Sequence, residues 1–100
     1  MKKVEEKKLK RKILLHSEQH ITWGEAKNTH AGIYKYQGKY YYVRYDGSYE
    51  CFEIDADDVK RLAVEKAIDF KTARRIARLF GLTLTEEEYS RLKNEVCANP

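Results

Sequence analysis

The strongest constraint on the fold of this chain is a pattern of period two that runs from Ile33 to Ile54. The residues are mostly aromatic, β-branched or charged, which is typical of half-buried strands. Two turn dipeptides, Gln37-Gly38 and Asp46-Gly47, interrupt the pattern, and Asp-Gly is among the strongest short hairpin signals. The stretch predicts a three-stranded antiparallel β-meander over about residues 32–54.

The register of the second hairpin stays open between two loop lengths. A three-residue loop, Asp46 to Ser48, would place Arg44 opposite Glu50, which is a favourable cross-strand pair. A two-residue loop would turn the side chains of the third strand to the other face of the sheet.

The chain before the meander predicts one helix and a connector. Residues 2–20 contain no Gly or Pro and carry apolar side chains at loosely helical spacing, so we expect a helix that frays before Leu9. Residues 21–32 include Trp23 among glycines and an asparagine, which favours a connector that places this aromatic side chain in the core.

Capping residues mark three helix starts after the meander. The stretch from Asp55 to Asp58 supplies an N-cap and an acidic first turn for one helix, and Asp69 can cap a second helix that Gly81 would end. Thr85 and Glu88 have the spacing of a capping box for the third. The predicted helices cover about residues 56–68, 70–80 and 85–96.

The predicted fold is α+β, and residues 1–100 are expected to form a single small domain, because a chain of this length favours one core. The net charge is +4, and residues 1–12 carry seven Lys or Arg against two Glu. The excess positive charge is therefore N-terminal, and residues 1–8 are compatible with a flexible basic arm. Such a charge balance favours an anionic partner.

Cysteine usage and hydropathy favour a cytoplasmic protein that does not contact a membrane. Cys51 and Cys97 are too few for a disulfide framework. The only apolar run after the basic N-terminus is residues 13–15, which is too short for a signal peptide core or a membrane span.

No pattern of catalytic residues is recognisable, so we expect neither an enzyme nor a cofactor. No Gly-rich phosphate loop or nucleophile elbow occurs, and neither cysteine has a His or a carboxylate tied to it by spacing. His16 and His20 are four residues apart on a predicted helix, but no local pattern supplies a third ligand. We therefore predict no metal site.

The predicted helix 70–80 has two faces. Small and apolar residues occupy one face, and four cations occupy the other. Arginine suits phosphate because its planar donor fork can bind two oxygens at once. The alternative is a solvated outer face, partly neutralised by Glu65 or Asp69, and the two interpretations are about equally supported. We call these four residues the cationic strip: Lys71, Arg74, Arg75 and Arg78.

We expect the remaining contacts to nucleic acid to come from the basic N-terminus and from one strand of the meander. These residues are Lys8, Lys10, Arg11, Lys12 and Arg44.

Tyrosine occurs eight times, and every copy except Tyr89 lies between residues 34 and 49. On the middle strand, Tyr40 and Tyr42 point to one face and Tyr41 and Tyr45 to the other. One face must cover the core. The other is either packed under the N-terminal helix or exposed as an aromatic platform, for which Tyr40 and Tyr42 are the candidates.

Two stretches permit comparison with DNA-binding families. Residues 56–96 resemble helix-turn-helix proteins in their three short helices and in the spacing of Ala77 and Gly81 before a turn. In that family the helix after the turn enters the major groove by its N-terminal end. That end carries three glutamates here, residues 86–88, so we expect any DNA contact from helix 70–80 and the basic arm.

The second comparison concerns residues 31–68, which include the sequence KYYYVRYDG from Lys39 to Gly47. This pattern is similar to the three-stranded DNA-binding domains at the N-termini of some tyrosine recombinases, which lay their sheet in the major groove. Glu50 and Glu53 make the present sheet less basic than that role requires.

These observations favour a small non-enzymatic module that contacts nucleic acid or a nucleoprotein complex, with duplex favoured over single strands. The alternative is a protein-binding adaptor or inhibitor, of the kind used by mobile elements or stress systems, that acts through the tyrosine-rich sheet. Homodimerisation through the N-terminal helix or a sheet edge is compatible with both.

Overall fold

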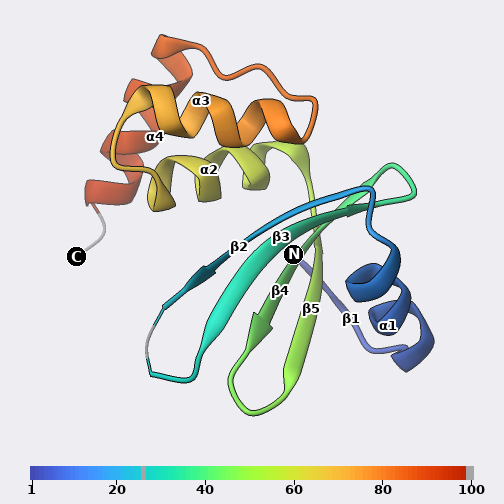
Figure 1. Cartoon of the computed structure of the whole chain (residues 1–100). Helices are drawn as coiled ribbons and strands as arrows, with labels where there is room; N and C mark the ends of the chain where they lie inside the picture. The colour runs from blue at the N-terminus through green and yellow to red at the C-terminus, as the bar shows by residue number, and fades with distance from the viewer. Residues whose placement is uncertain (26, 99–100) are drawn as a thin grey trace. The chain divides into compact units, whose positions relative to one another are not determined.

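The computed structural model describes residues 1–25 and 27–98. The chain forms two compact units, Met1–Asp55 and Ala56–Pro100, and each is described by itself (Figure 1). The single domain predicted over residues 1–100 stays a prediction.

The first unit is a five-stranded antiparallel sheet with one helix. The strand order is β1-β5-β4-β3-β2. Its elements in chain order are β1 (Lys2–Val4), α1 (Lys7–His16), β2 (Gln19–Gly24), β3 (His30–Tyr36), β4 (Lys39–Tyr45) and β5 (Tyr49–Ile54).

The prediction of a three-stranded sheet is wrong, because β1 and β2 flank the three strands of the meander. β1 is three residues long, too short to show a period, and it pairs with β5 far along the chain. β2 does alternate, with Ile21 and Trp23 half-buried between exposed neighbours, but the sequence-based interpretation divided it between a helix and a connector. With five strands, the likeness to the three-stranded recombinase domains does not hold.

The single helix predicted over residues 2–20 is also wrong, because these residues form a strand, a helix and the start of another strand. Helix α1 ends at His16, after which Ser17 has an extended backbone. The amide of Glu18 donates to the carbonyl oxygen of Lys35 at 2.8 Å, and the Glu18 carboxylate accepts from the amide of Gln37 at 2.6 Å. These cross-strand bonds favour the extended conformation over another helical turn.

The two hairpins have the geometry that their turn residues allow. Gln37 and Gly38 both have positive φ, 50° and 76°, in a two-residue loop between Tyr36 and Lys39. The second hairpin has the three-residue loop. Arg44 therefore faces Glu50, which decides the register that the sequence left open.

Helix α1 packs on one face of the sheet, which we call the α1 face. Leu9, Leu14, Tyr34 and Tyr36 lie at the border of this core, partly buried. The buried residues of the α1 face and its helix are Val4, Ile13, Tyr41, Val43 and Cys51.

The second unit consists of three helices, α2 (Ala56–Lys66), α3 (Phe70–Leu79) and α4 (Glu86–Ala98). Two of the caps expected from the sequence, at Asp69 and at Thr85 with Glu88, are confirmed. The Asp69 carboxylate accepts from the amide of Thr72 at 2.8 Å. The hydroxyl of Thr85 accepts from the amide of Glu88 at 3.1 Å, and Glu88 accepts in return from the amide of Thr85 at 3.0 Å. The core of this unit contains Val64, Ala67, Ala73, Ala77, Leu84 and Leu92.

Across the described ranges 1–25 and 27–98, no helix is both long enough and apolar enough to cross a membrane.

Candidate nucleic-acid interface

Helix α1 carries a dense set of cations that form no ion pair with any acid that the structure describes. Residues 7–12 contain five Lys or Arg and no acid. The buried side chain of Ile13 and the partly buried Leu9 and Leu14 attach the helix to the sheet. Four of the five cations are exposed, and Lys10 is half-buried. In the part of the chain that the structure describes, none of the five forms an ion pair.

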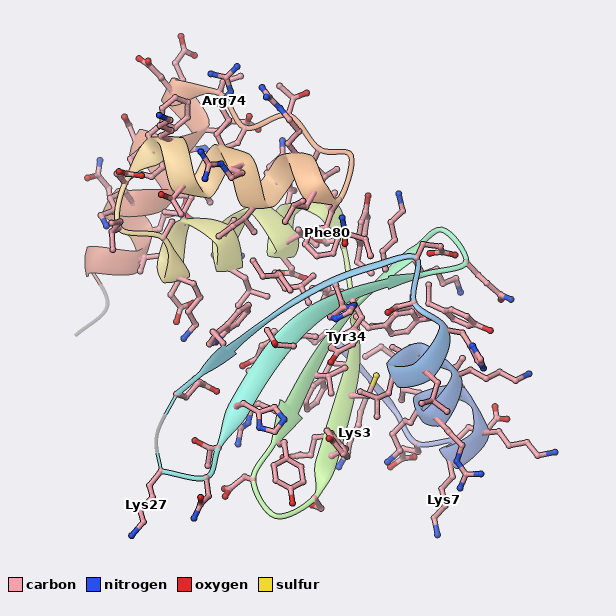
Figure 2. All side chains as sticks on the ribbon, viewed as in Figure 1. Lys3, Lys7, Lys27, Tyr34, Arg74 and Phe80 are labelled. Atoms are coloured by element: carbon pink, nitrogen blue, oxygen red, sulfur yellow. The ribbon has the colours of Figure 1, made fainter. Side chains whose placement is uncertain are left out.

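A pocket of about 640 Å³ lies between α1 and the α1 face, and we call it the α1 pocket. Figure 2 labels one residue from each side of it, Lys7 on the helix and Tyr34 on β3. Leu15 and Tyr49 are 68% and 44% exposed, so the pocket has open apolar surface beside its cations. The lining residues are Lys7, Lys10, Arg11, Leu14, Leu15, Tyr34 and Tyr49.

Aromatic rings continue the floor of the α1 pocket along the sheet. His20 stacks on Tyr34, with ring centroids 5.3 Å apart and planes 11° from parallel. Tyr49 lies 4.8 Å from Tyr45, on which His30 stacks at 5.0 Å. The strand register places all five rings on the α1 face.

The packing of the Tyr34 ring depends on Gly32 of the same strand. A Cβ at Gly32 would lie 3.1 Å from Cε1 of Tyr34, so the absence of a side chain at Gly32 leaves the space that the ring occupies. Burial raises the pKa of the Tyr34 phenol, and the phenol of Tyr49 raises it further.

Lys8 and Lys12 lie on the other side of α1, beside Tyr36 and Gln37, where they line a smaller pocket of about 220 Å³ together with Glu6. The four predicted α1 cations therefore stand on one short helix but face two sides of it. Lys10 and Arg11 belong to the α1 pocket.

The other predicted residues of the first unit lie on the opposite face of the sheet. Tyr40 and Tyr42 are partly buried, with Lys35 Nζ 5.6 Å from the Tyr40 ring and the Phe52 ring 6.5 Å from that of Tyr42. Arg44 is exposed and forms an ion pair with Glu50 at 3.9 Å. The structure thus separates Tyr40, Tyr42 and Arg44 from the cations of α1.

The sequence-based site omitted Lys7, Leu14, Leu15, Tyr34 and Tyr49. The strand alternation contained a usable signal for the tyrosines, because Tyr34 is opposite Tyr41, and Tyr49 is opposite Tyr45. What the alternation could not supply was which face the helix covers.

The second unit holds the cationic strip on α3. All four residues are exposed, and Figure 2 labels Arg74. Hydrogen bonds from Thr72 lower the pKa of Asp69, and Lys71 and Arg75 lower it further. Arg74 and Arg78 line a pocket of about 260 Å³ with residues 81–84, the segment between α3 and α4.

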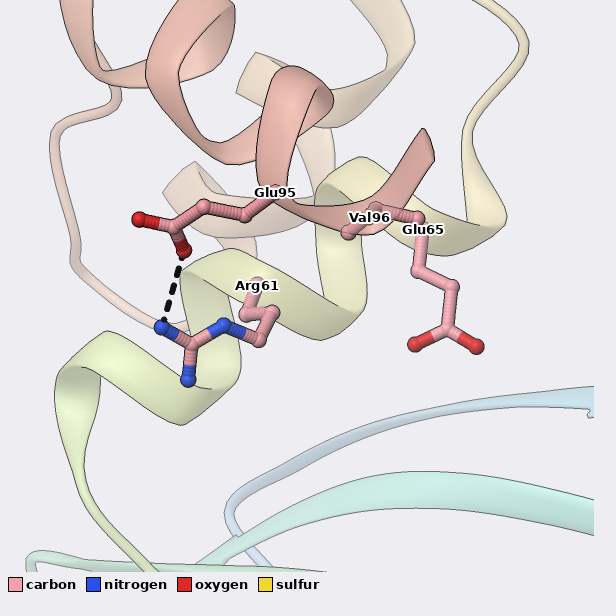
Figure 3. Close-up of a pocket in the computed structure, with 4 residues that line it drawn as sticks. All are labelled: Arg61, Glu65, Glu95 and Val96. Carbon is pink, nitrogen blue, oxygen red and sulfur yellow. Dashed lines mark hydrogen bonds and ion pairs between the residues drawn. The ribbon is translucent and has the colours of Figure 1, made fainter. Parts of the chain in front are cut away.

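A further pocket, of about 660 Å³, is lined by Arg61, Glu65, Glu95 and Val96 of α2 and α4 (Figure 3). Arg61 pairs with Glu95 at 3.2 Å and with Asp58 at 3.6 Å. With two carboxylates on its only lining cation, this pocket is a poor site for an anion.

The histidine pair and Cys51 lie in three different elements of the first unit. His16 ends α1 and His20 lies in β2, so they do not share a helix face. Within residues 1–25 and 27–98, no group of three or more His, Cys, Asp or Glu is placed to hold a metal ion. Cys51 lies in the core of the first unit, where burial raises its pKa to about 11.

No protein-family model matches the chain, and neither a curated protein nor a solved structure is detectably similar to it.

Proposed function

We propose that the protein is a non-enzymatic nucleic-acid-binding module that binds through the α1 pocket. The observation that supports this most directly is the placement of Lys7, Lys10 and Arg11 beside Tyr34 and Tyr49. Phosphates are attracted by Lys and Arg, and aromatic rings offer faces on which bases stack. The α1 pocket provides both kinds of contact within one site.

The state of the α1 cations supports a binding role over a purely solvated surface. A solvated helix face commonly carries acids at i, i+3 or i, i+4 spacing, which offset its cations. Helix α4 has such a pair, Arg91 with Glu95 at 3.7 Å, and α2 has Arg61 with Asp58. Helix α1 has none among the described residues, so its positive potential is available to an anionic ligand.

The cationic strip supplies a second surface for phosphate. Its four residues are exposed, and none has an ion pair with another residue that the structure describes. We propose that the strip contacts the phosphate backbone of the nucleic acid, which increases affinity without preference for a base sequence.

The test is fluorescence anisotropy with labelled oligonucleotides over a series of salt concentrations. Lys7→Gln with Arg11→Gln should weaken binding by about 10-fold and should reduce the slope of log affinity against log salt by about 1 to 1.5, because each lost phosphate contact changes the slope by about 0.7 for single strands. Both side chains are exposed, so the fold should be retained.

The matched control is Lys3→Gln with Lys27→Gln, which removes the same charge from the same unit outside the α1 pocket. The control should bind within about threefold of the unmodified protein. Equal losses in both double variants would show that only net charge matters and would overturn the proposed site. Failure of micromolar protein to bind any oligonucleotide at low salt would overturn the function itself, and a stoichiometric, nuclease-insensitive protein partner would then favour the adaptor alternative.

A further inference from the structure

We infer that the α1 pocket selects single strands, because it is built to take an unpaired base against Tyr49 and Tyr34 while phosphates lie along α1. This inference rests on the proposed nucleic-acid-binding function and names its substrate class. It differs from the preference for duplex that the sequence suggested.

The first step of the argument is the size and lining of the α1 pocket. A volume of about 640 Å³ lies within the range of roughly 300 to 1,000 Å³ that is usual for pockets that hold small organic ligands. Leu14, Leu15 and the two tyrosines give it apolar walls, whereas backbone phosphates alone need no apolar surface. A heterocyclic base attached to a phosphate matches both parts of the lining.

The second step is that the tyrosine rings are already in place. The ring of Tyr34 stacks on His20 and occupies the space that a side chain at Gly32 would fill. Tyr49 is supported on one side by Tyr45, at 4.8 Å, and remains 44% exposed. A ring that is fixed before binding loses little conformational entropy when a base stacks on it.

The third step is the position of the cations. Lys7, Lys10 and Arg11 are at i, i+3 and i+4, so they share one side of α1 and form the helix rim of the pocket. A strand that passes along this rim can keep its phosphates on the helix while one base turns toward the tyrosines. In a duplex each base is paired and stacked on its neighbours, so the rings of the pocket have no base face to contact.

The inference is tested with four labelled probes of equal length: a single-stranded DNA, the same sequence as RNA, the corresponding DNA duplex, and a DNA backbone of abasic residues. The unmodified protein should bind the two single strands about 10-fold more tightly than the duplex and the abasic backbone. The DNA and RNA probes distinguish the two sources of single strands.

Substitution at the floor of the pocket separates stacking from charge. Tyr49→Leu keeps an apolar side chain but removes the ring, and it should weaken binding of single strands by about 10-fold while leaving the abasic backbone within about twofold. Tyr49→Phe keeps the ring and should bind single strands within about threefold. Tyr42→Leu, on the opposite face, is the matched control and should also bind within about threefold. Circular dichroism of each variant checks the fold.

The inference is overturned if duplex or abasic backbone binds as well as single strands, or if Tyr49→Leu weakens all four probes equally. In those cases the loss seen with Lys7→Gln and Arg11→Gln would still support the proposed function. If no probe binds, both fail. If anionic vesicles bind the pocket in competition with single strands and more tightly, the occupant is a lipid surface and the inference is wrong.

Discussion

Glu88 links two helices of the second unit and caps one of them, so its replacement tests the structure quantitatively. One carboxylate oxygen accepts from Lys60 Nζ of α2 at 2.8 Å, and the other accepts from the amide of Thr85 at 3.0 Å. The hydrogen bond from Lys60, followed by that from the Thr85 backbone, lowers the pKa of Glu88 from 4.5 to about 2. Glu88→Ala removes the contact with α2 and half of the capping box together.

The expected cost of Glu88→Ala is about 2 to 3 kcal/mol. Loss of a helix cap costs about 1 kcal/mol. A hydrogen bond between charged groups contributes about 1.5 to 3 kcal/mol when buried, and an exposed ion pair contributes less than about 1 kcal/mol. The Lys60 and Glu88 side chains are 16% and 28% exposed, so an intermediate value of about 1 to 2 kcal/mol applies. The lowered pKa itself corresponds to about 3 kcal/mol at most, and solvent screening reduces this value.

The assay is urea unfolding, followed by circular dichroism, of the unmodified protein, Glu88→Ala, Glu88→Gln and Lys60→Met. Glu88→Gln should cost about 1 to 2 kcal/mol, because Gln still accepts the Thr85 amide but is uncharged. In the Lys60→Met background the same substitution should cost less than about 0.5 kcal/mol, because its partner is already absent.

The direction of the pKa shift decides how the contribution of Glu88 to stability changes with pH. The pKa of Glu88 is lower in the folded protein than in the unfolded chain, so its contribution is complete above pH 4.5 and is lost as the pH falls toward about 2. The advantage of the unmodified protein over Glu88→Gln should therefore shrink through this interval. The reasoning would be refuted if the difference in free energy of unfolding between the unmodified protein and Glu88→Gln stayed constant from neutral pH down to a pH of about 2. A cost of Glu88→Ala below about 0.5 kcal/mol would refute it as well.

Three further outcomes test the first unit. Gly32→Ala should lower its stability by about 1 to 3 kcal/mol in urea, because the added Cβ would lie 2.7 Å from a backbone oxygen of the neighbouring strand and 3.1 Å from Tyr34, and an unchanged midpoint would contradict this packing. Cys51 should be alkylated at about pH 8 at least 100-fold more slowly in the folded protein than in urea, because burial raises its pKa from 9.0 to about 11; peptide mapping that shows equal rates would place the thiol outside the core. Glu50→Gln should change the free energy of unfolding by less than about 1 kcal/mol, because the two ion pairs of Glu50 are 3.9 Å long and exposed. A larger decrease of the free energy of unfolding, measured by urea denaturation, would show that these ion pairs are stronger than their geometry indicates.

Local signals in the sequence predicted the parts of the structure that local interactions control. The capping box at Thr85 and the cap at Asp69 form within single turns, and both are present. The exposure of the cationic strip follows from helical periodicity alone. By contrast, β1 forms by pairing with β5, where Val4 is opposite Cys51. These residues are far apart in the sequence, so local patterns do not predict the pairing.

The same distinction explains why the sequence did not single out the aromatic residues of the α1 pocket. Alternation on β4 divides the tyrosines into two sets, one with Tyr42 and the other with Tyr41, but it cannot say which set a distant helix will cover. Burial of Ile13 against the face of Tyr41 decides this, and that contact is non-local. Helix α1 covers its face of the sheet only in part, and the α1 pocket lies at this face. The predicted platform is on the other face, where Tyr42 is the cross-strand neighbour of Phe52.

Arginines of α2 and α4 form ion pairs with acids of the same helix, whereas the cations of α1 do not in the part of the chain that the structure describes. This difference bears on the role of the α1 cations. In α2 and α4, Arg61 and Arg91 have acids one turn away, an arrangement that stabilises a helix by a few tenths of a kcal/mol per pair. In α1, five cations among residues 7–12 repel one another, which destabilises a ten-residue helix that is already too short to be stable by itself. Packing of Ile13 and its neighbours on the sheet therefore has to offset that repulsion. A ligand that brings phosphates to α1 would relieve the same repulsion, so the feature that weakens the isolated helix is the feature that would strengthen its complex.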